Sequence, residues 1–345
     1  MESPFITEIL NRLPVKSLLQ CRCVCTRWRC LIDSRPFMES HLNRSIESST
    51  NLCFCCRGSS SLYCIDLVSP GDVVEIEYPL RWKRIKALGS CRGLLCISKP
   101  DVRDVAIWNP FIRRHKFLPP TDTQIGGGLY PSACVHGFGY DDENDDYVLL
   151  RLIQTFEEPI ESAVSIYSLR ANEWRQLQEM PYYLVSTRKM MGVFVHGRLH
   201  WLMKRELVPN SAKVLVAFDF RIEEFVEVHQ LNFIDNRLDI DLAVLGRCLC
   251  LIVYGERRGV DVWIMRDYGL NRPWDMLFSM PNHSRPLGLV RPLAYSQNGR
   301  EVLVRVGTET LRWHDLPTGH DRRFDIIAMP VLEAEICLRT FVPVN

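Results

Sequence analysis

A two-part sequence unit recurs about every 50 residues through most of the chain, and this repeat constrains the fold more than any other feature. The first part is a pair of apolar runs around a glycine-containing turn, as in SCRGLLCI (90–97) and FVHGRLHWL (194–202). The second part is an apolar run that reaches an anchor residue and continues through a polar turn. The anchors are Ile65, Trp108, Tyr167, Phe218, Trp263 and Trp313, and they lie 43 to 59 residues apart.

A period of this length is what a four-stranded propeller blade needs, and it resembles the kelch period. Each unit would expose an apolar sheet face that only a neighbouring unit can cover, so the units should close into one domain. The six anchors therefore predict an all-β body of about six blades, with the run ICLRTFV (336–342) as a candidate strand that closes the ring. An irregular β-sandwich is the alternative, because the diglycine pairs of kelch blades are missing.

The first 45 residues have a helical pattern instead. Four apolar residues spaced for one helix face come first: Ile6, Ile9, Leu10 and Leu13. Pro14 ends that helix, two further short helices are expected after it, and Pro36 and Phe37 are expected to close the unit.

This head has more apolar surface than three short helices can bury. A unit of this size lies near the limit, roughly 40 to 60 residues, at which a single core sustains itself. The rest of the chain or a partner must therefore cover part of the surface. The head also has seven Lys and Arg residues against four acids, and this basic excess favours an acidic partner.

Composition excludes several classes of function. A hydrophobic fraction of 47% with 24% charged residues suits a soluble globular protein, and a net charge of +1 does not support a general nucleic-acid or membrane-surface binder. The N-terminal residues lack the pattern of a signal peptide, and no run approaches the roughly 18 apolar residues of a membrane span. We therefore expect a protein of the cytoplasm and nucleus, in which the 14 cysteines act as small buried hydrophobes.

Several motifs that could carry chemistry are better explained as structural. Gly89–Gly93 has the spacing of a nucleophile elbow, but a strand follows it, which favours a hairpin turn. Two cysteine groups are better explained by packing than by a zinc site: strand residues Cys53, Cys55, Cys56 and Cys64, and the head cysteines Cys21, Cys23, Cys25 and Cys30. Asp141–Asp146 is expected to be an acidic turn and not a calcium loop, and Gly126–Gly128 a flexible loop and not a phosphate loop. His196 and His200 are expected to be structural and not metal ligands.

The order of motifs resembles a known family. The run from Ile6 to Phe37, with LPVKSLL, RCVC and W-R-x-L-I, resembles a plant F-box. GSCRGLLCI, IWNP, VFVHGRLHWL, AFDFRIEEF and VDVWIMRDYG resemble the F-box-associated, kelch-like domain of plant F-box proteins, and most of all its immunity-regulating members. The resemblance implies an α+β multidomain chain: a small N-terminal three-helix F-box (1–45), then an all-β kelch-like propeller of about six blades (46–345).

The resemblance implies a substrate-recognition subunit of an SCF-type (Skp1–cullin–F-box) E3 ubiquitin ligase. The F-box would dock a Skp1-like adaptor, and through it a cullin, while the propeller binds a target protein for ubiquitination and proteasomal degradation. Seven residues match the family's adaptor-contacting or core positions: Ile9, Leu10, Leu13, Pro14, Leu18, Val24 and Trp28. Of these, Leu13 and Leu18 would insert into the adaptor's groove, and Trp28 would anchor the head's own packing. One departure is Met1-Glu2, where the family usually has Leu-Pro; Pro4 is a first-turn proline nearby.

Such a subunit is not an enzyme, so we expect no catalytic residue, cofactor or metal, and no nucleic-acid or membrane partner. The target surface is expected on loops of one rim: Trp82–Lys86, Thr121–Pro131, Thr155–Glu161, Tyr182–Met190 and Tyr268–Arg285. Two alternatives remain open. The first is a Skp1-associated ligand-binding or self-incompatibility-type recognition propeller, and the second is a propeller hydrolase with convergent carboxylates or a Ser-His-Asp set in the central channel.

Overall fold

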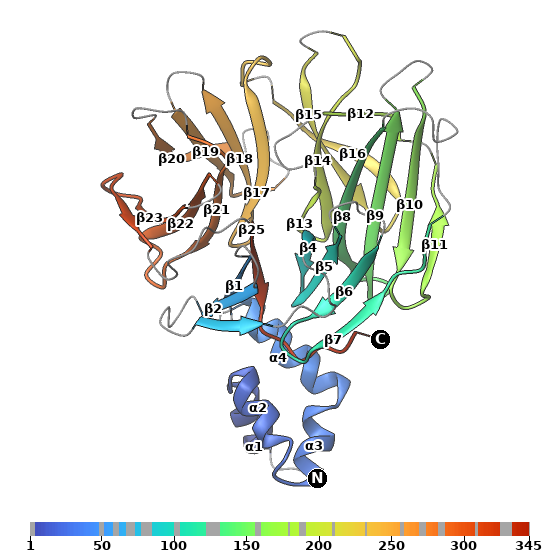
Figure 1. Ribbon diagram of the computed structural model, residues 1–345, viewed down its shortest axis with the longest axis vertical. Helices are drawn as coiled ribbons and strands as arrows, with labels where there is room; N and C mark the ends of the chain where they lie inside the picture. The colour runs from blue at the N-terminus through green and yellow to red at the C-terminus, as the bar shows by residue number, and fades with distance from the viewer. Residues whose placement is uncertain are drawn as a thin grey trace. The chain divides into compact units, whose positions relative to one another are not determined.

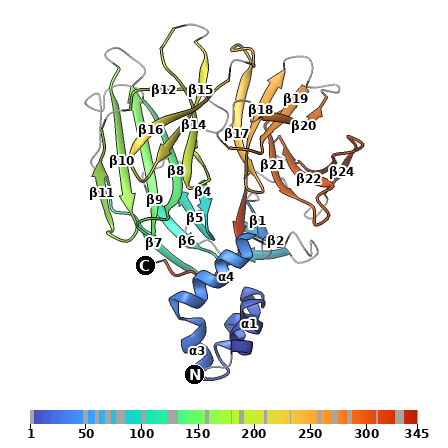
Figure 2. The same ribbon diagram turned by 180° about the vertical axis from the view of Figure 1, so that it is seen from behind.

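The computed structural model contains two compact units, which are described separately: Met1–Phe117 with Ala334–Asn345, and Leu118–Glu333. The structure describes residues 4–47, 52–57, 62–66, 73–76, 85–99, 104–121, 132–155, 160–178, 180–185, 191–208, 211–231, 233–255, 259–268, 274–281, 287–307, 310–324 and 333–344. Figure 1 and Figure 2 label most of their helices and strands.

The first unit begins with four helices: α1 (Pro4–Asn11), α2 (Val15–Cys21), α3 (Thr26–Ile32) and α4 (Arg35–Glu47). The prediction of three helices closed by Pro36 and Phe37 is therefore wrong. Pro36 lies in the first turn of α4, where backbone N–H groups have no intrahelical partner, so a proline is tolerated there. Both views show α4 between the other three helices and strand β1 of the same unit (Figure 1, Figure 2).

Two antiparallel sheets complete the first unit. The order in one sheet is β25 (Glu333–Leu338), β1 (Leu52–Arg57), β2 (Leu62–Asp66) and β3 (Val73–Ile76). The order in the other is β4 (Lys86–Cys91), β5 (Leu94–Ser98), β6 (Val105–Asn109) and β7 (Arg114–Phe117). The last strand of the chain thus pairs with the first, although it begins at Glu333, earlier than the predicted residue 336.

The second unit has four sheets, and consecutive strands pair in each of them except for β12 and β13. They contain β8 (Ser132–Asp141), β9 (Asp146–Thr155), β10 (Ser162–Ser168) and β11 (Glu173–Gln176); β12 (Tyr183–Leu184), β13 (Val193–Val195), β14 (Arg198–Lys204), β15 (Lys213–Asp219) and β16 (Glu224–Gln230); β17 (Asp239–Leu245), β18 (Cys248–Gly255), β19 (Gly259–Met265) and β20 (Trp274–Met280); and β21 (Val290–Tyr295), β22 (Glu301–Val306), β23 (Thr310–Asp315) and β24 (Asp321–Arg323).

Across the two units, five of the six described sheets have the four strands of a regular blade, fewer than the predicted number of about six. The remaining sheet has five strands, because the short strands β12 and β13 both pair with β14. The position that one strand fills elsewhere is divided here between two short segments. In the second unit, apolar clusters join each sheet to the next along the chain, as the repeat predicts.

The sequence repeat has a simple structural meaning. All six anchors lie on the third strand of their sheet: Ile65 on β2, Trp108 on β6, Tyr167 on β10, Phe218 on β15, Trp263 on β19 and Trp313 on β23. Five of the six side chains are buried, and Trp263 is half-buried. The glycine-containing turns join the first two strands, as at Arg92-Gly93 and His196-Gly197, where both residues have positive φ and form a two-residue hairpin turn.

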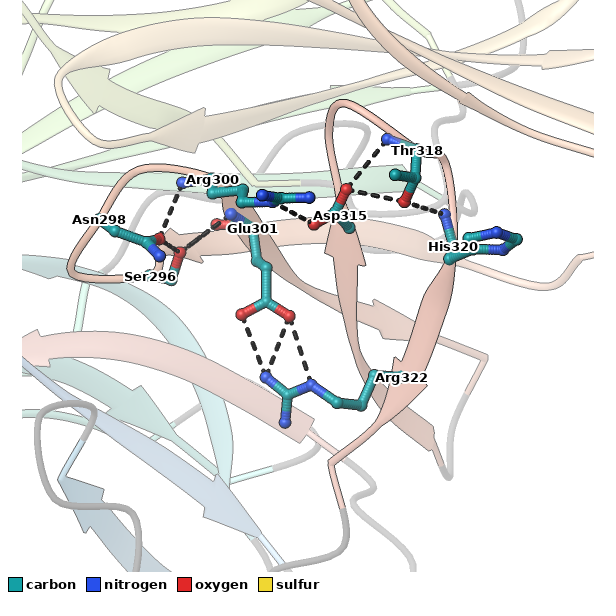
Figure 3. Close-up of polar contacts among 8 residues, drawn as sticks. All are labelled: Ser296, Asn298, Arg300, Glu301, Asp315, Thr318, His320 and Arg322. Atoms are coloured by element: carbon teal, nitrogen blue, oxygen red, sulfur yellow. Dashed lines mark hydrogen bonds and ion pairs between the residues drawn. The ribbon is translucent and has the colours of Figure 1, made fainter.

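A polar residue at the end of each of several third strands caps the following turn. The side chains of Asn109, Asp219 and Asp315 accept hydrogen bonds from backbone N–H groups two or three residues ahead, at 2.9 to 3.0 Å. Figure 3 shows this for the last sheet, where Asp315 also binds Arg300 at 2.7 Å and Glu301 pairs with Arg322. These contacts close the polar turns that the sequence repeat predicts.

The motifs interpreted as structural mostly have that role. Gly89–Gly93 is in the β4–β5 hairpin, and Asp141–Asp146 spans the turn from β8 to β9. Cys53, Cys55 and Cys56 lie on β1, and the buried Cys64 lies on β2. His200 is buried and hydrogen-bonds Tyr268 through Nε2 at 2.7 Å, and burial lowers the pKa of His200 to about 4. Gly126–Gly128 lies outside the described residues.

Two predictions are wrong. Cys23, Cys25 and Cys30 are exposed, because larger aliphatic side chains fill the core of the head. Residues 274–280 form strand β20, so the predicted loop Tyr268–Arg285 contains a strand that pairs with β19. Much of the other four predicted loops lies outside the described residues.

Candidate functional site

The helical head has a core of its own, to which the rest of the first unit contributes. The buried members are Leu10, Val15, Leu18, Ile32, Phe37 and Phe341. Phe341 comes from the C-terminal segment, and Ile112 of the β6–β7 turn packs against the same cluster. Phe341 and Ile112, which lie outside the head, therefore cover part of its apolar surface, as one of the two expectations stated.

Pro14 gives the head its shape. It has φ −60° and ψ 152°, and its carbonyl accepts the first helical hydrogen bond of α2 from Leu18 N at 3.0 Å. The carbonyl of Leu13, left without a helical partner by this break, is 3.0 Å from Nε2 of His41 on α4, which donates to it. The break between α1 and α2 is thus held by a buried imidazole from the last helix.

Apolar side chains remain exposed on the head after this packing. Phe5 is 79% exposed, Ile9 61% and Val24 64%, whereas Leu13 and Trp28 are half-buried and Pro14 is exposed. Phe5 and Ile9 are four residues apart on α1, so they share one face of that helix. Exposed aliphatic and aromatic side chains at this density on a small unit indicate a docking surface.

The structure places two of the seven predicted residues, Leu10 and Leu18, in the head's own core. Leu18 is fully buried and Leu10 is 2% exposed, because both point into the head's own core. Leu18 therefore cannot insert into a partner's groove while the head keeps this fold. Ile9, Leu13, Pro14, Val24 and Trp28 stay accessible, so direct contact with an adaptor through these five remains a prediction.

The charged residues of the head are mostly paired. Glu8 binds Arg12 at 2.7 Å, Asp33 binds Arg22 at 2.6 Å, and Arg35 binds Glu39 at 2.6 Å. The Arg12 guanidinium lowers the pKa of the Glu8 carboxyl, and Asp33 raises the pKa of Arg22. Within residues 5–46 the exposed side chains of Lys16 and Arg27 have no carboxylate within 4.0 Å.

The sequence pattern did not single out Phe5, and it showed Lys16 and Arg27 only as part of the basic excess of the head. Phe5 could have been found from its i, i+4 spacing to Ile9. Lys16 and Arg27, which have no acidic partner within residues 5–46, could not have been separated from the five paired arginines, since pairing depends on how the helices pack.

Other kinds of site find little support in the described ranges. No helix there is long and apolar enough to cross a membrane. No group of three or more His, Cys, Asp or Glu side chains among the same residues could hold a metal ion. Ser296, Asp315 and His320 lie on neighbouring turns of the last sheet (Figure 3), but the hydrogen bonds of Ser296 Oγ and of the Asp315 carboxylate close the turns and bind Arg300.

The chain is thus a two-part α+β protein, in which a small helical head with exposed apolar side chains is followed by repeated antiparallel sheets. Comparison with known families agrees. The family described as F-box domain matches residues 4–40, and the family described as F-box associated beta propeller domain matches residues 60–315. The chain belongs to the F-box proteins that have this β-propeller domain.

Three proteins of Arabidopsis thaliana are similar over most of their length. F-box protein CPR1 is 30% identical over 334 residues, which cover 90% of this chain and 81% of that protein. F-box protein At4g22390 is 29% identical, with 90% and 82% covered, and F-box/kelch-repeat protein At3g23880 is 29% identical, with 86% and 83% covered. The similarity therefore spans head and body together.

Proposed function

We propose that this chain is the substrate-recognition subunit of an SCF-type E3 ubiquitin ligase. The helical head binds a Skp1-type adaptor, and through it a cullin, while the propeller binds a target protein. The chain itself is non-catalytic. It brings a target lysine near a charged ubiquitin-conjugating enzyme, which raises the effective concentration of the two reactants.

The exposed surface of the head supports this proposal best. The core of the head is already filled, so the exposed Phe5, Ile9 and Val24 have no packing role that we can identify. Lys16 on α2 and Arg27 on α3 are exposed and have no acidic partner among the described head residues. An acidic adaptor with an apolar groove satisfies both requirements.

The attachment of the head suggests where the target binds. In the sheet β4–β7, the β4–β5 turn reaches α4 through Arg92 and Asn43 at 3.5 Å, and the β6–β7 turn packs Ile112 on the head. These turns lie at one end of the sheet, so the β5–β6 connection and the segment after β7 leave from the opposite end. We propose that the target binds at this opposite end of the sheet, where β5 ends at Ser98, β6 begins at Val105 and β7 ends at Phe117.

Two finer assignments are part of the proposal. The resemblance of the motifs to immunity-regulating F-box proteins suggests a role in plant defence, and we propose that the chain acts in the cytoplasm and nucleus. Fractionation of a tagged chain, and defence-gene expression after its removal, test these two points separately.

The main test is affinity purification of the full chain beside the variant Ile9→Asp/Val24→Asp. Each substitution places a charge where the structure has an exposed apolar side chain, so the head should still fold. Val74→Asp is a matched control, because Val74 is 53% exposed on β3, outside the head. We expect the adaptor and cullin with the wild type and the control, and neither with the double variant.

Recovery of neither protein with the wild type would overturn the proposal. A bound protein that accumulates on the adaptor-deficient variant and is depleted by the wild type would identify the target. A bound protein whose level and ubiquitination never change would contradict the degradation role and favour a recognition function.

A further inference from the structure

The C-terminal segment of the chain is attached to both sheets of the first unit. Its strand β25 pairs with β1, and the Ser90 hydroxyl of β4 donates to the carbonyl of Ile336 at 2.6 Å. Cys337, which is buried, packs in the cluster that joins the two sheets. The segment is therefore part of the β-body up to this point.

A buried asparagine then fixes the backbone of the next residues. The Nδ2 group of Asn109, at the end of β6, donates to the carbonyls of Thr340 at 3.2 Å and of Val342 at 2.8 Å. Its Oδ1 accepts from Phe111 N at 3.0 Å, so both ends of this fully buried amide are used. Thr340 also packs so closely on the β4–β5 turn that a Cβ at Gly93 would lie 2.3 Å from it.

The residue between these two carbonyls reaches the head. The side chain of Phe341 is buried, with its ring centre 6.2 Å from that of Phe37 and 5.3 Å from that of His41, both on α4. His41 in turn donates to Leu13 at the α1–α2 break. A continuous series of contacts thus runs from β6 through Phe341 to the part of the head that presents its exposed surface.

The chain connects head and body covalently in one place, between α4 and β1. A single connection restrains distance but leaves rotation possible, whereas a second attachment at Phe341 also restrains orientation. We infer that Phe341, held in place by Asn109, is a positioning residue that fixes the orientation of the F-box head on the first two sheets. This inference rests on the proposed function for its purpose, because ubiquitin transfer depends on the orientation of the target as well as on its proximity.

The test measures the distance between head and body in the full chain. Spin labels on genetically encoded ketone side chains replace Gln20 on α2 and Phe117 on β7, both of which are exposed. Distance distributions are recorded for the wild type, Phe341→Ala, the size-conserving Phe341→Met, and Asn109→Ala. Phe111→Ala is the matched control, because Phe111 packs in the cluster between the two sheets and not in the head.

We expect one narrow distribution for the wild type, Phe341→Met and Phe111→Ala. Phe341→Ala should broaden or split it, and Asn109→Ala should broaden it less, while the affinity for the adaptor stays within about twofold of the wild type. Unchanged affinity with altered orientation is a result that a general loss of stability does not give.

A narrow, wild-type distribution in Phe341→Ala would overturn the inference. If Phe341→Ala does not fold, a narrow, wild-type distribution in Asn109→Ala would overturn the inference instead. A wild type that fails to bind the adaptor would overturn the proposed function, but the distances in the free chain would still test the attachment. The two failures are therefore distinguishable.

Discussion

The ring of Trp201 is confined between two glycines in the second unit, and this permits a quantitative prediction. Trp201 lies on β14 and is 4% exposed. A Cβ at Gly137 of β8 would lie 2.5 Å from Cζ2 of the ring, and a Cβ at Gly192 would lie 2.5 Å from the same atom. Ordinary contacts of this kind are 3.4 to 4 Å, so Gly137→Ala requires a shift of about 1 Å in a ring that has no room on its other side.

We expect Gly137→Ala to lower the free energy of unfolding by about 1–3 kcal/mol, the usual cost of overpacking. Backbone strain should add nothing, since the φ of Gly137 is not positive. Trp201→Phe should cost about 1–3 kcal/mol through the cavity that it leaves. It removes no hydrogen bond to the described part of the chain, because Nε1 of Trp201 is buried there without a partner.

The double variant should be less destabilised than the sum of the two single variants, by about 1–2 kcal/mol, because the smaller ring makes room for the new methyl group. Denaturant unfolding at equilibrium, followed by far-UV circular dichroism, measures all four corners of the cycle. A Gly137→Ala variant within about 0.5 kcal/mol of the wild type, or a strictly additive cycle, would refute the steric argument.

Three further predictions concern the first unit. Leu18→Ala should lower the free energy of unfolding by about 2–5 kcal/mol. Ile9→Ala should change it by less than about 0.5 kcal/mol but weaken adaptor binding about 30-fold or more. Denaturant unfolding measures the first effect and titration calorimetry the second, and a reversed pattern would contradict the assigned roles. Burial lowers the pKa of His41, so stability should be full above pH about 6.5 and fall below it as the unfolded chain takes up a proton, and His41→Asn should flatten this part of the pH profile measured by urea unfolding. Gly93→Ala should lower the melting temperature, since it combines a φ of +85° with a contact to Thr340; an unchanged melting temperature would show that the segment can move away.

The repeat of the body could be predicted because its signals are local. A glycine-containing turn needs positive φ at adjacent residues, and a buried third strand needs an apolar anchor, so both appear in the sequence at the blade period. The division of one strand into β12 and β13 has no such signal. It depends on how residues 183–184 and 193–195 meet β14, which is a matter of tertiary pairing.

The head could be predicted only in outline. Periodicity identifies the apolar stripe of α1, but it does not show which residues of the stripe the neighbouring helices cover. The adjacent residues Ile9 and Leu10 were therefore both predicted to bind the adaptor, although Ile9 is 61% exposed and Leu10 is 2% exposed. Leu18 was assigned to a partner for the same reason. The fourth helix was missed because Pro36 was interpreted as an end, whereas a proline suits the first turn of a helix equally well.

The contact between Phe341 and α4 could not have been predicted from pattern at all. Phe341 is separated from Phe37 and His41 by about 300 residues, and an aromatic residue after a strand is common in any β-protein. The contact follows from the pairing of the last strand with the first one. That pairing brings the end of the chain back to the sheet next to the head, where Asn109 can hold its backbone. Strand β25 completes its sheet and also brings Phe341 to the head. Truncation of the chain before β25 should therefore affect the orientation of the head as well as the stability of the sheet.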